Sequence, residues 1–149
     1  MQTISPLIVF TLSDSSGETA EAVSKAALAQ FPNTSVRFYR LARLTSVEEL
    51  KAILEEIAKE KGLIAYTLVR RDLKDALESE AARLNVPIID LLGPLINKVA
   101  QITKISPLSQ AGRLHLLDSS YYERIAAIDF AIRYDDGKNP EGLVQADVI

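Results

Sequence analysis

The chain has 149 residues, of which 48% are hydrophobic and 25% charged, a composition typical of one soluble globular domain. It has no cysteine and a single histidine, His115, which excludes disulfides, thiol chemistry and the usual zinc sites. The net charge of −3 argues against a nucleic-acid or anionic-membrane partner, and no apolar run approaches the roughly 20 residues of a membrane-spanning helix. We therefore expect a cytoplasmic protein.

The first half of the chain alternates strand and helix patterns. A nearly continuous apolar run predicts a buried strand over 7–12. Residues 18–31 follow with helical spacing, and residues 36–41 alternate apolar with polar, as in a more exposed edge strand. The stripe predicted to be buried on the first helix consists of Ala20, Val23, Ala27 and Phe31.

A second helix is predicted over 47–61. Thr45 and Ser46 are candidate N-caps, and glutamates follow each of them three residues later, as in a capping box. Gly62 is the predicted glycine that ends the helix in the left-handed conformation. The buried face of this helix is predicted to be Val47, Leu50, Leu54 and Ile57.

The same alternation continues to the end of the chain. The remaining predicted elements are strands at 63–69 and 86–92 and helices at 71–85, 95–102 and 121–134. The buried face of the predicted helix at 71–85 is expected to be Leu73, Ala76, Leu77, Ala81 and Leu84.

Successive strand–helix units predict an α/β fold. We expect three layers, with a mostly parallel sheet in the order 2-1-3-4 and helices on both faces, as in flavodoxin-like or Rossmann-like domains. Residues 1–145 would form this N-terminal domain. Residues 146–149, Ala-Asp-Val-Ile, are interpreted as the start of a strand that belongs to a second domain beyond Ile149.

A loop rich in hydroxyl groups follows the first predicted strand and leads directly into a helix. Backbone N–H groups and the positive end of a helix dipole favour an anion at such a place, so a phosphate or nucleotide site is one interpretation. The other is simple capping, with Ser15 and Glu18 as a capping box. The candidate ligands in this segment are Asp14, Ser15, Ser16, Gly17, Glu18 and Thr19.

Arginines follow the two neighbouring strands. Arg40 and Arg43 come after the second predicted strand, and Arg70 and Arg71 come after the third. In the order 2-1-3 these side chains would flank the hydroxyl-rich loop, where guanidinium groups suit phosphate oxygens. The alternative is a solvated charged rim.

Four further residues have two interpretations each. Asp90 could contact a ribose or a metal, or could cap the following helix. Asp135 and Asp136 could bind Mg²⁺ or form a turn. His115 could act as an acid or base, although no spaced partner supports this, or could simply pack. We predict no metal site and no catalytic residue within these 149 residues.

Several segments in order resemble one known family, the bifunctional regulatory proteins of pyruvate, phosphate dikinase and phosphoenolpyruvate synthase. The segments are Ser-Asp-Ser-Ser-Gly-Glu-Thr-Ala at 13–20, Pro-Ile-Ile-Asp-Leu-Leu-Gly-Pro-Leu at 87–95, Arg-Ile with Ala-Ile-Asp-Phe-Ala-Ile over 124–132, Asp-Asp-Gly at 135–137, Gly-Leu at 142–143, and Ala-Asp-Val-Ile at 146–149. Each motif alone is modest, but together they span the whole chain.

The resemblance implies a serine/threonine kinase and phosphorylase. Such proteins inactivate the dikinase or synthase by phosphorylating a threonine with ADP, and they reactivate it with inorganic phosphate, releasing pyrophosphate. ADP and phosphate would be substrates and Mg²⁺ a candidate cofactor, with none required by this domain. In the family the nucleotide-binding loop follows the Ala-Asp-(Val/Ile)-Ile strand, so we expect the catalytic residues beyond Ile149 and an inactive isolated chain.

Two other functions remain open. The domain could be a non-catalytic module that docks the partner enzyme or senses phosphate or nucleotide, or it could be a receiver-like or flavin-binding domain. The oligomeric state is open as well, because an incomplete strand at 146–149 could pair with a second chain in a homodimer.

Overall fold

The computed structural model describes residues 5–113, which form successive strand–helix units. The predicted helix at 121–134 and the predicted strand start at 146–149 lie outside these residues. The described strands are β1 (Leu7–Leu12), β2 (Val36–Leu41), β3 (Leu63–Tyr66) and β4 (Ile88–Asp90). The described helices are α1 (Glu18–Leu28), α2 (Val47–Glu60), α3 (Arg71–Leu84) and α4 (Gly93–Thr103).

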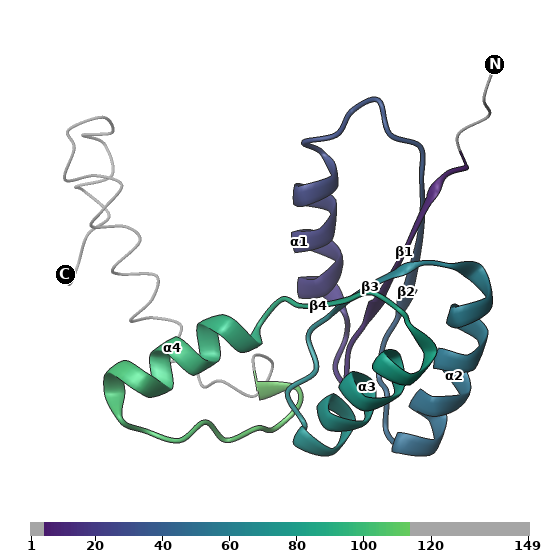
Figure 1. Ribbon diagram of the computed structural model, residues 1–149. Helices are drawn as coiled ribbons and strands as arrows, with labels where there is room; N and C mark the ends of the chain where they lie inside the picture. Colours follow the sequence, from purple (N-terminus) through teal and green to yellow (C-terminus); the bar gives the residue numbers. More distant parts are fainter. Residues whose placement is uncertain (1–4, 114–149) are drawn as a thin grey trace, which may run out of the picture. The chain divides into compact units, whose positions relative to one another are not determined.

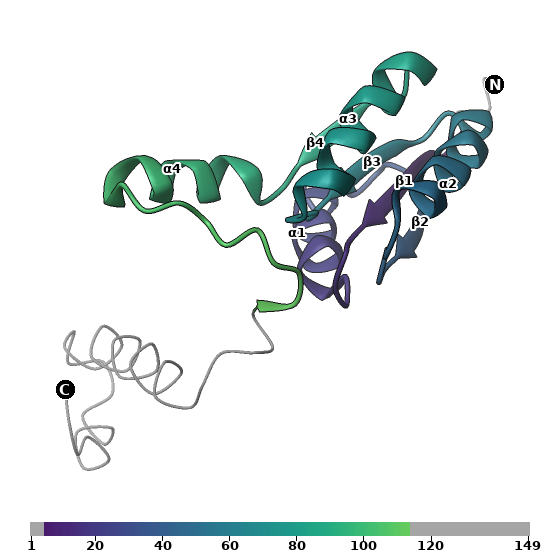
Figure 2. The same cartoon turned by 90° about the horizontal axis from the view of Figure 1, so that it is seen from below.

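Within residues 5–113 the strands form one parallel sheet in the order β2-β1-β3-β4. Helix α1 covers one face of the sheet, and α2 and α3 lie side by side on the other (Figures 1 and 2). The predicted α/β fold, its strand order and its helices on both faces are confirmed. The alternating segment 36–41 is an edge strand, as its pattern predicted.

The main core lies between the sheet and the pair α2 and α3. Leu12 and Ile64 of the sheet have no exposed surface, and the same is true of Leu50 and Leu54 on α2 and of Leu73 on α3. Each such side chain contributes roughly 1.5–3 kcal/mol by leaving water. The buried faces predicted for α2 and α3 are therefore correct.

The buried face predicted for α1 is right at Ala20 and wrong at its other three residues. Val23 is 44% exposed and Phe31 is 62% exposed, whereas Ala20 and Ser24 are buried. The helix ends before it reaches Phe31. Strand alternation places Val9 and Thr11 on the α1 side of β1. The side of α1 that is buried there consists of small side chains and not of its most apolar ones.

The start of α2 agrees with the prediction, and its end does not. Ser46 Oγ accepts the Glu49 N–H at 3.1 Å, and Glu49 reaches back to the backbone N–H of Thr45, also at 3.1 Å. At the other end the residue in the left-handed conformation is Lys61, with φ 55°, and not Gly62. The capping box is confirmed, and the predicted position of the terminating residue is wrong by one.

The strands β3 and β4 are shorter than predicted. The segment 63–69 leaves the sheet after Tyr66, because the N–H of Val69 bonds to the Asp14 carboxylate and not to a neighbouring strand. In the same way, the segment 86–92 forms a strand only over Ile88–Asp90, and the N–H of Leu92 bonds to the side chain of Asp90. Both loops reach the carboxyl edge of the sheet.

Candidate functional site

The topological switch point of the sheet lies between β1 and β3. From β1 the chain passes to α1 on one face, and from β3 it passes to α3 on the other. In open α/β sheets ligands bind beyond the carboxyl ends of the strands at such a point. The segment after β1 is residues 13–17, here called the serine loop, and the segment after β3 is residues 67–70.

The serine loop is fixed by backbone hydrogen bonds to the connection between β2 and α2. Ser13 donates its N–H to Leu41 O at 3.0 Å and accepts the N–H of Leu44 at 3.1 Å. Ser15 O accepts the N–H of Arg43 at 2.9 Å, and Ser15 N–H bonds to Ser13 Oγ at 3.0 Å. The loop therefore has a defined conformation before any ligand binds.

Asp14 joins the serine loop to the start of α3. Its Oδ2 accepts the backbone N–H groups of Val69 at 3.0 Å and of Arg70 at 2.9 Å, and Arg70 is the N-cap of α3. The protein's own carboxylate thus takes donors that a bound anion could use at this helix N-terminus. Asp14 acts as a bridge between the two loops of the switch point.

At the start of α1 the predicted capping box is wrong. The N-cap is Gly17, with φ 83°, and no side chain caps the helix. Glu18 N–H lies 3.5 Å from Ser16 Oγ, and Ser15 does not serve as a cap. A Cβ at Gly17 would lie 3.0 Å from Arg40 Nε, so both the positive φ and the close approach favour glycine.

Arg40 is held by contacts inside the protein. Its Nε donates to Ser16 O at 3.1 Å, its Nη2 contacts the same oxygen, and its Nη1 lies 2.8 Å from Glu21 Oε2. Hydrogen bonds from Lys25 first, and from Arg40 as well, lower the pKa of Glu21. This guanidinium positions the serine loop.

Arg70 is also engaged in contacts inside the protein, whereas Arg43 and Arg71 have no such side-chain contacts in the described part of the chain. Its Nε and Nη2 form a two-point contact with Asp72 at 3.1 and 2.7 Å, which lowers the pKa of that carboxyl, and its Nη1 donates to Thr45 O at 2.8 Å. The guanidinium groups of Arg43 and Arg71 are exposed and form no hydrogen bond or ion pair within residues 5–113.

Asp90 accepts backbone N–H groups at the start of the following helix, whose N-cap residue is Leu92. Its Oδ1 accepts the N–H groups of Leu92 at 3.1 Å and Gly93 at 2.7 Å, and its Oδ2 lies 2.9 Å from Lys74 Nζ. A Cβ at Gly93 would lie 1.9 Å from Asp90 Oδ2. Of the two interpretations of Asp90, the structure supports the cap.

The other predicted site residues divide into two sets. Glu18 and Thr19 are exposed in the first turn of α1, while His115, Asp135 and Asp136 lie outside the described residues.

Within residues 5–113 no three acidic or histidine side chains gather as a metal ion would require. In the same part of the chain no helix is long and apolar enough to cross a membrane.

The sequence patterns did not predict the polar contact between Tyr66 of β3 and Glu78 of α3. Tyr66 is 2% exposed, and its hydroxyl lies 3.3 Å from Glu78 Oε1. Burial first, and then the charges of Asp90 and Glu78, raise the pKa of this phenol. No local pattern could have found the pair, because it depends on how α3 packs on β3.

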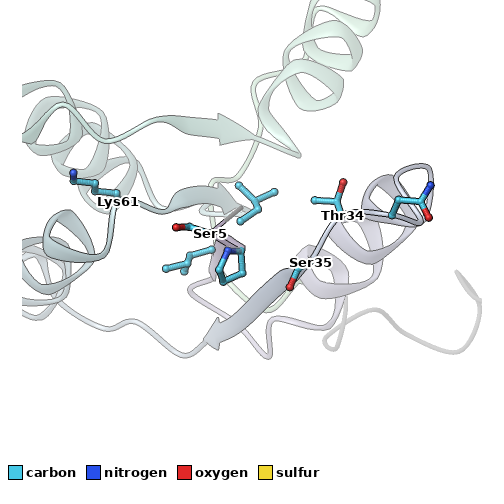
Figure 3. Close-up of a pocket in the computed structure, with 8 residues that line it drawn as sticks. Ser5, Thr34, Ser35 and Lys61 are labelled. Carbon is cyan, nitrogen blue, oxygen red and sulfur yellow. The ribbon is translucent and has the colours of Figure 1, made fainter. Parts of the chain in front are cut away.

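A hollow of about 500 Å³ lies at the amino ends of β1 and β2, away from the switch point. Figure 3 shows Lys61 on one side of it and Thr34 on the other, with Ser5 and Ser35 between them. Its polar groups belong to residues near the ends of elements at the opposite edge of the sheet. We therefore do not include this hollow in the candidate site.

Comparison with known proteins decides the family. The sequence profile of the kinase/pyrophosphorylase family matches residues 9–149. The chain belongs to the kinase/pyrophosphorylase family. Relatives provisionally named pyruvate, phosphate dikinase regulatory proteins are 44% identical in Carboxydothermus hydrogenoformans, 42% in Listeria monocytogenes and 40% in Geobacter sulfurreducens. The matches cover 95% of this chain and 51%, 52% and 52% of the three relatives, so the chain spans about half the length of these relatives.

Proposed function

We propose that this chain is the N-terminal part of a cytoplasmic kinase and phosphorylase that regulates pyruvate, phosphate dikinase or phosphoenolpyruvate synthase. The full protein would transfer a phosphoryl group from ADP to a threonine of the target and would remove it with inorganic phosphate, releasing pyrophosphate. The observation that carries the proposal is the family match over residues 9–149, together with the names of relatives at 40–44% identity.

In this proposal the described domain holds a phosphate-bearing ligand at the serine loop. The support is chemical. Ser15 has a hydroxyl that caps no helix, and α1 begins two residues after the Ser15–Ser16 pair. Near the same edge of the sheet, Arg43 and Arg71 have guanidinium groups that make no hydrogen bond or ion pair within residues 5–113. Phosphoryl transfer depends mainly on positioning and charge stabilisation, which a loop fixed before binding provides at low cost.

The nucleotide-binding loop and the catalytic residues are expected beyond Ile149. The residues described here bring together no metal-ligand cluster, so we assign no Mg²⁺ ligand and no step through a metal ion to this domain. Its own role would be to orient a phosphate group and to present the target segment.

Ligand titration tests the role of the serine loop. ADP, AMP and phosphate are titrated separately into the chain, followed by calorimetry and by amide NMR shifts. We expect shifts at Ser15, Gly17 and Thr19, and affinity losses of about tenfold in Ser15→Ala and Arg71→Ala, since a hydrogen bond to a charged group contributes roughly 1.5–3 kcal/mol. Lys51→Ala, an exposed change on α2, is the control.

A second candidate is a docking module without catalytic activity. Glu18 and Glu21 place negative charge in the first turn of α1, which opposes a phosphate there. Purified pyruvate, phosphate dikinase is therefore mixed with the chain and ADP, and threonine phosphorylation is measured by mass spectrometry. Both candidates predict no transfer by these 149 residues, so transfer would contradict both. Binding of the dikinase without ADP shifts at the serine loop would favour docking, whereas ADP shifts there would favour the kinase proposal.

A further inference from the structure

An apolar groove lies along the free edge of the sheet, between β2 and α2. Its volume is about 540 Å³, and apolar side chains form its floor and walls. Phe10 and Ile57 form the floor and are nearly buried, at 8% and 2% exposure. Tyr39 of β2 and Ile53 of α2 form the walls. We call this hollow the β2–α2 groove.

The ring of Tyr39 gives the groove an apolar surface that is partly exposed to solvent. Its ring stacks on Phe10 with the centroids 5.2 Å apart and the planes 19° apart, so the tyrosine is fixed in place. It is nevertheless 46% exposed. A fixed, half-exposed aromatic ring is a favourable contact for a large apolar side chain or a cation.

The rim of the groove on α2 is acidic. Glu56 and Glu60 line it, one helical turn apart, and both are exposed. Among the described residues Glu56 pairs with Lys59 alone, at 3.1 Å in an exposed contact of little energetic value. Within residues 5–113 Glu60 has no ion pair, and Arg37, on the same face of β2 as Tyr39, pairs with neither glutamate. The negative rim is therefore not neutralised by a direct ion pair with β2.

The strand beside the groove has a free edge. β2 pairs with β1 on one side only, and no other described strand lies beyond it. Outward backbone N–H and C=O groups of an edge strand can accept an added strand from another chain. The groove and the edge run side by side, so one extended segment could use both.

We propose that the β2–α2 groove docks an extended segment of a partner protein. The segment pairs with the edge of β2, sets a large apolar side chain against Tyr39, and places lysine or arginine side chains at alternate positions against Glu56 and Glu60. Alternate residues of a strand lie about 6.6–6.8 Å apart, and one turn of α2 rises about 6 Å over four residues, so the two spacings match. The inference does not depend on the phosphate site.

A synthetic peptide, acetyl-Ser-Leu-Thr-Arg-Thr-Arg-Ser-amide, tests the proposal with the whole 149-residue chain, because its leucine and its two arginines stand at successive alternate positions. We expect amide shifts at Tyr39 and Ile53, and an affinity that falls at least about tenfold in the double variant Glu56→Lys, Glu60→Lys, because opposite charges across the groove become like charges. Glu48→Lys makes the same change on α2 outside the groove and should bind as the unmodified chain does. Arg37→Ala should bind more tightly, since it removes a like charge.

Two modified peptides separate the parts of the proposal. N-methylation at alternate residues removes strand pairing and should abolish binding, and glutamate in place of both arginines should do the same. The proposal is overturned if the glutamate peptide binds equally, if the double variant binds normally, or if no shift maps to the groove. It is also overturned if sedimentation shows a second copy of the chain in the groove, or if the peptide cannot bind because the chain's own remaining residues occupy it.

Discussion

Oδ2 of Asp14 lies 2.9 Å from the backbone nitrogen of Arg70, 56 residues further along the chain. This one hydrogen bond connects the loop after β1 to the N-cap residue of α3, across the switch point of the sheet. The same oxygen also accepts the N–H of Val69. The geometry of the candidate site therefore depends on a carboxylate that bonds to the protein's own backbone.

Replacing Asp14 should destabilise the protein. Asp14→Ala leaves two partly buried N–H groups without an acceptor and removes a negative charge at the start of α3, so we expect the free energy of unfolding to fall by about 1–3 kcal/mol. Asp14→Asn keeps one acceptor oxygen and should cost less. Urea denaturation measures both, with the exposed Asp75→Ala on α3 as the control. Equal midpoints for Asp14→Ala and Asp75→Ala would show that the bridge contributes nothing.

The fold could be predicted from the sequence because its signals are local. The apolar run of β1 and the apolar stripes of α2 and α3 identify the strands and helices and their order along the chain. Successive strand–helix units are compatible with only a few parallel-sheet topologies. The buried face of α1 could not be predicted. The burial of Ser24 and the exposure of Val23 depend on how the helix packs on β1, which no pattern within the helix specifies.

The contacts of the candidate site were less predictable than its location. The sequence placed Asp14, Arg40 and Arg70 at the carboxyl edge, and the structure brings them there. Their partners lie far away in sequence, or in the backbone, as in the contact between Arg40 and Ser16 O. The spacing of residues in the sequence does not distinguish an arginine that binds a ligand from one that bonds to the backbone of a loop.

The junction of α2 and β3 gives a pair of opposite predictions. Lys61 adopts φ 55°, which costs a non-glycine residue roughly 1–2 kcal/mol, so Lys61→Gly should stabilise the protein by up to about 1 kcal/mol. A Cβ at Gly62 would lie 2.6 Å from Phe10 Cε2, so Gly62→Ala should destabilise it by about 1–3 kcal/mol. Thermal unfolding of the two variants measures both signs.

A second substitution checks the cause of the Gly62 effect. Phe10→Leu shortens the ring side chain that the new methyl group would meet. In the Phe10→Leu background, Gly62→Ala should cost less than it does alone, and this coupling is measured by a double-mutant cycle. Purely additive effects would argue against a clash with this ring.

Asp90 should be needed to start α4. Asp90→Ala removes the acceptor of the Leu92 and Gly93 N–H groups, and we expect a loss of about 1–2 kcal/mol with faster amide exchange in the first turn of α4. Lys74→Met removes only the ion pair at 2.9 Å and should cost less, because both backbone contacts remain. If Lys74→Met were the more damaging variant, the ion pair and not the cap would be the main contribution of Asp90.

Tyr66 should give the protein a dependence on alkaline pH. Burial raises the pKa of its phenol above the ordinary value of 10.0, so the folded state retains a proton that the unfolded state releases above that pH. The stabilisation is complete below pH 10 and is lost as pH rises further, with a slope of about 1.4 kcal/mol per pH unit.

Tyr66→Phe isolates this contribution. At neutral pH it removes only a long hydrogen bond of 3.3 Å to Glu78, so the free energy of unfolding should change by less than about 1 kcal/mol. Above pH 10 the variant should lose stability less steeply than the unmodified protein, because no buried phenol must ionise. Urea unfolding at intervals from pH 8 to 11 measures both slopes, and parallel curves would mean that the Tyr66 phenol ionises as easily in the folded state as in the unfolded chain.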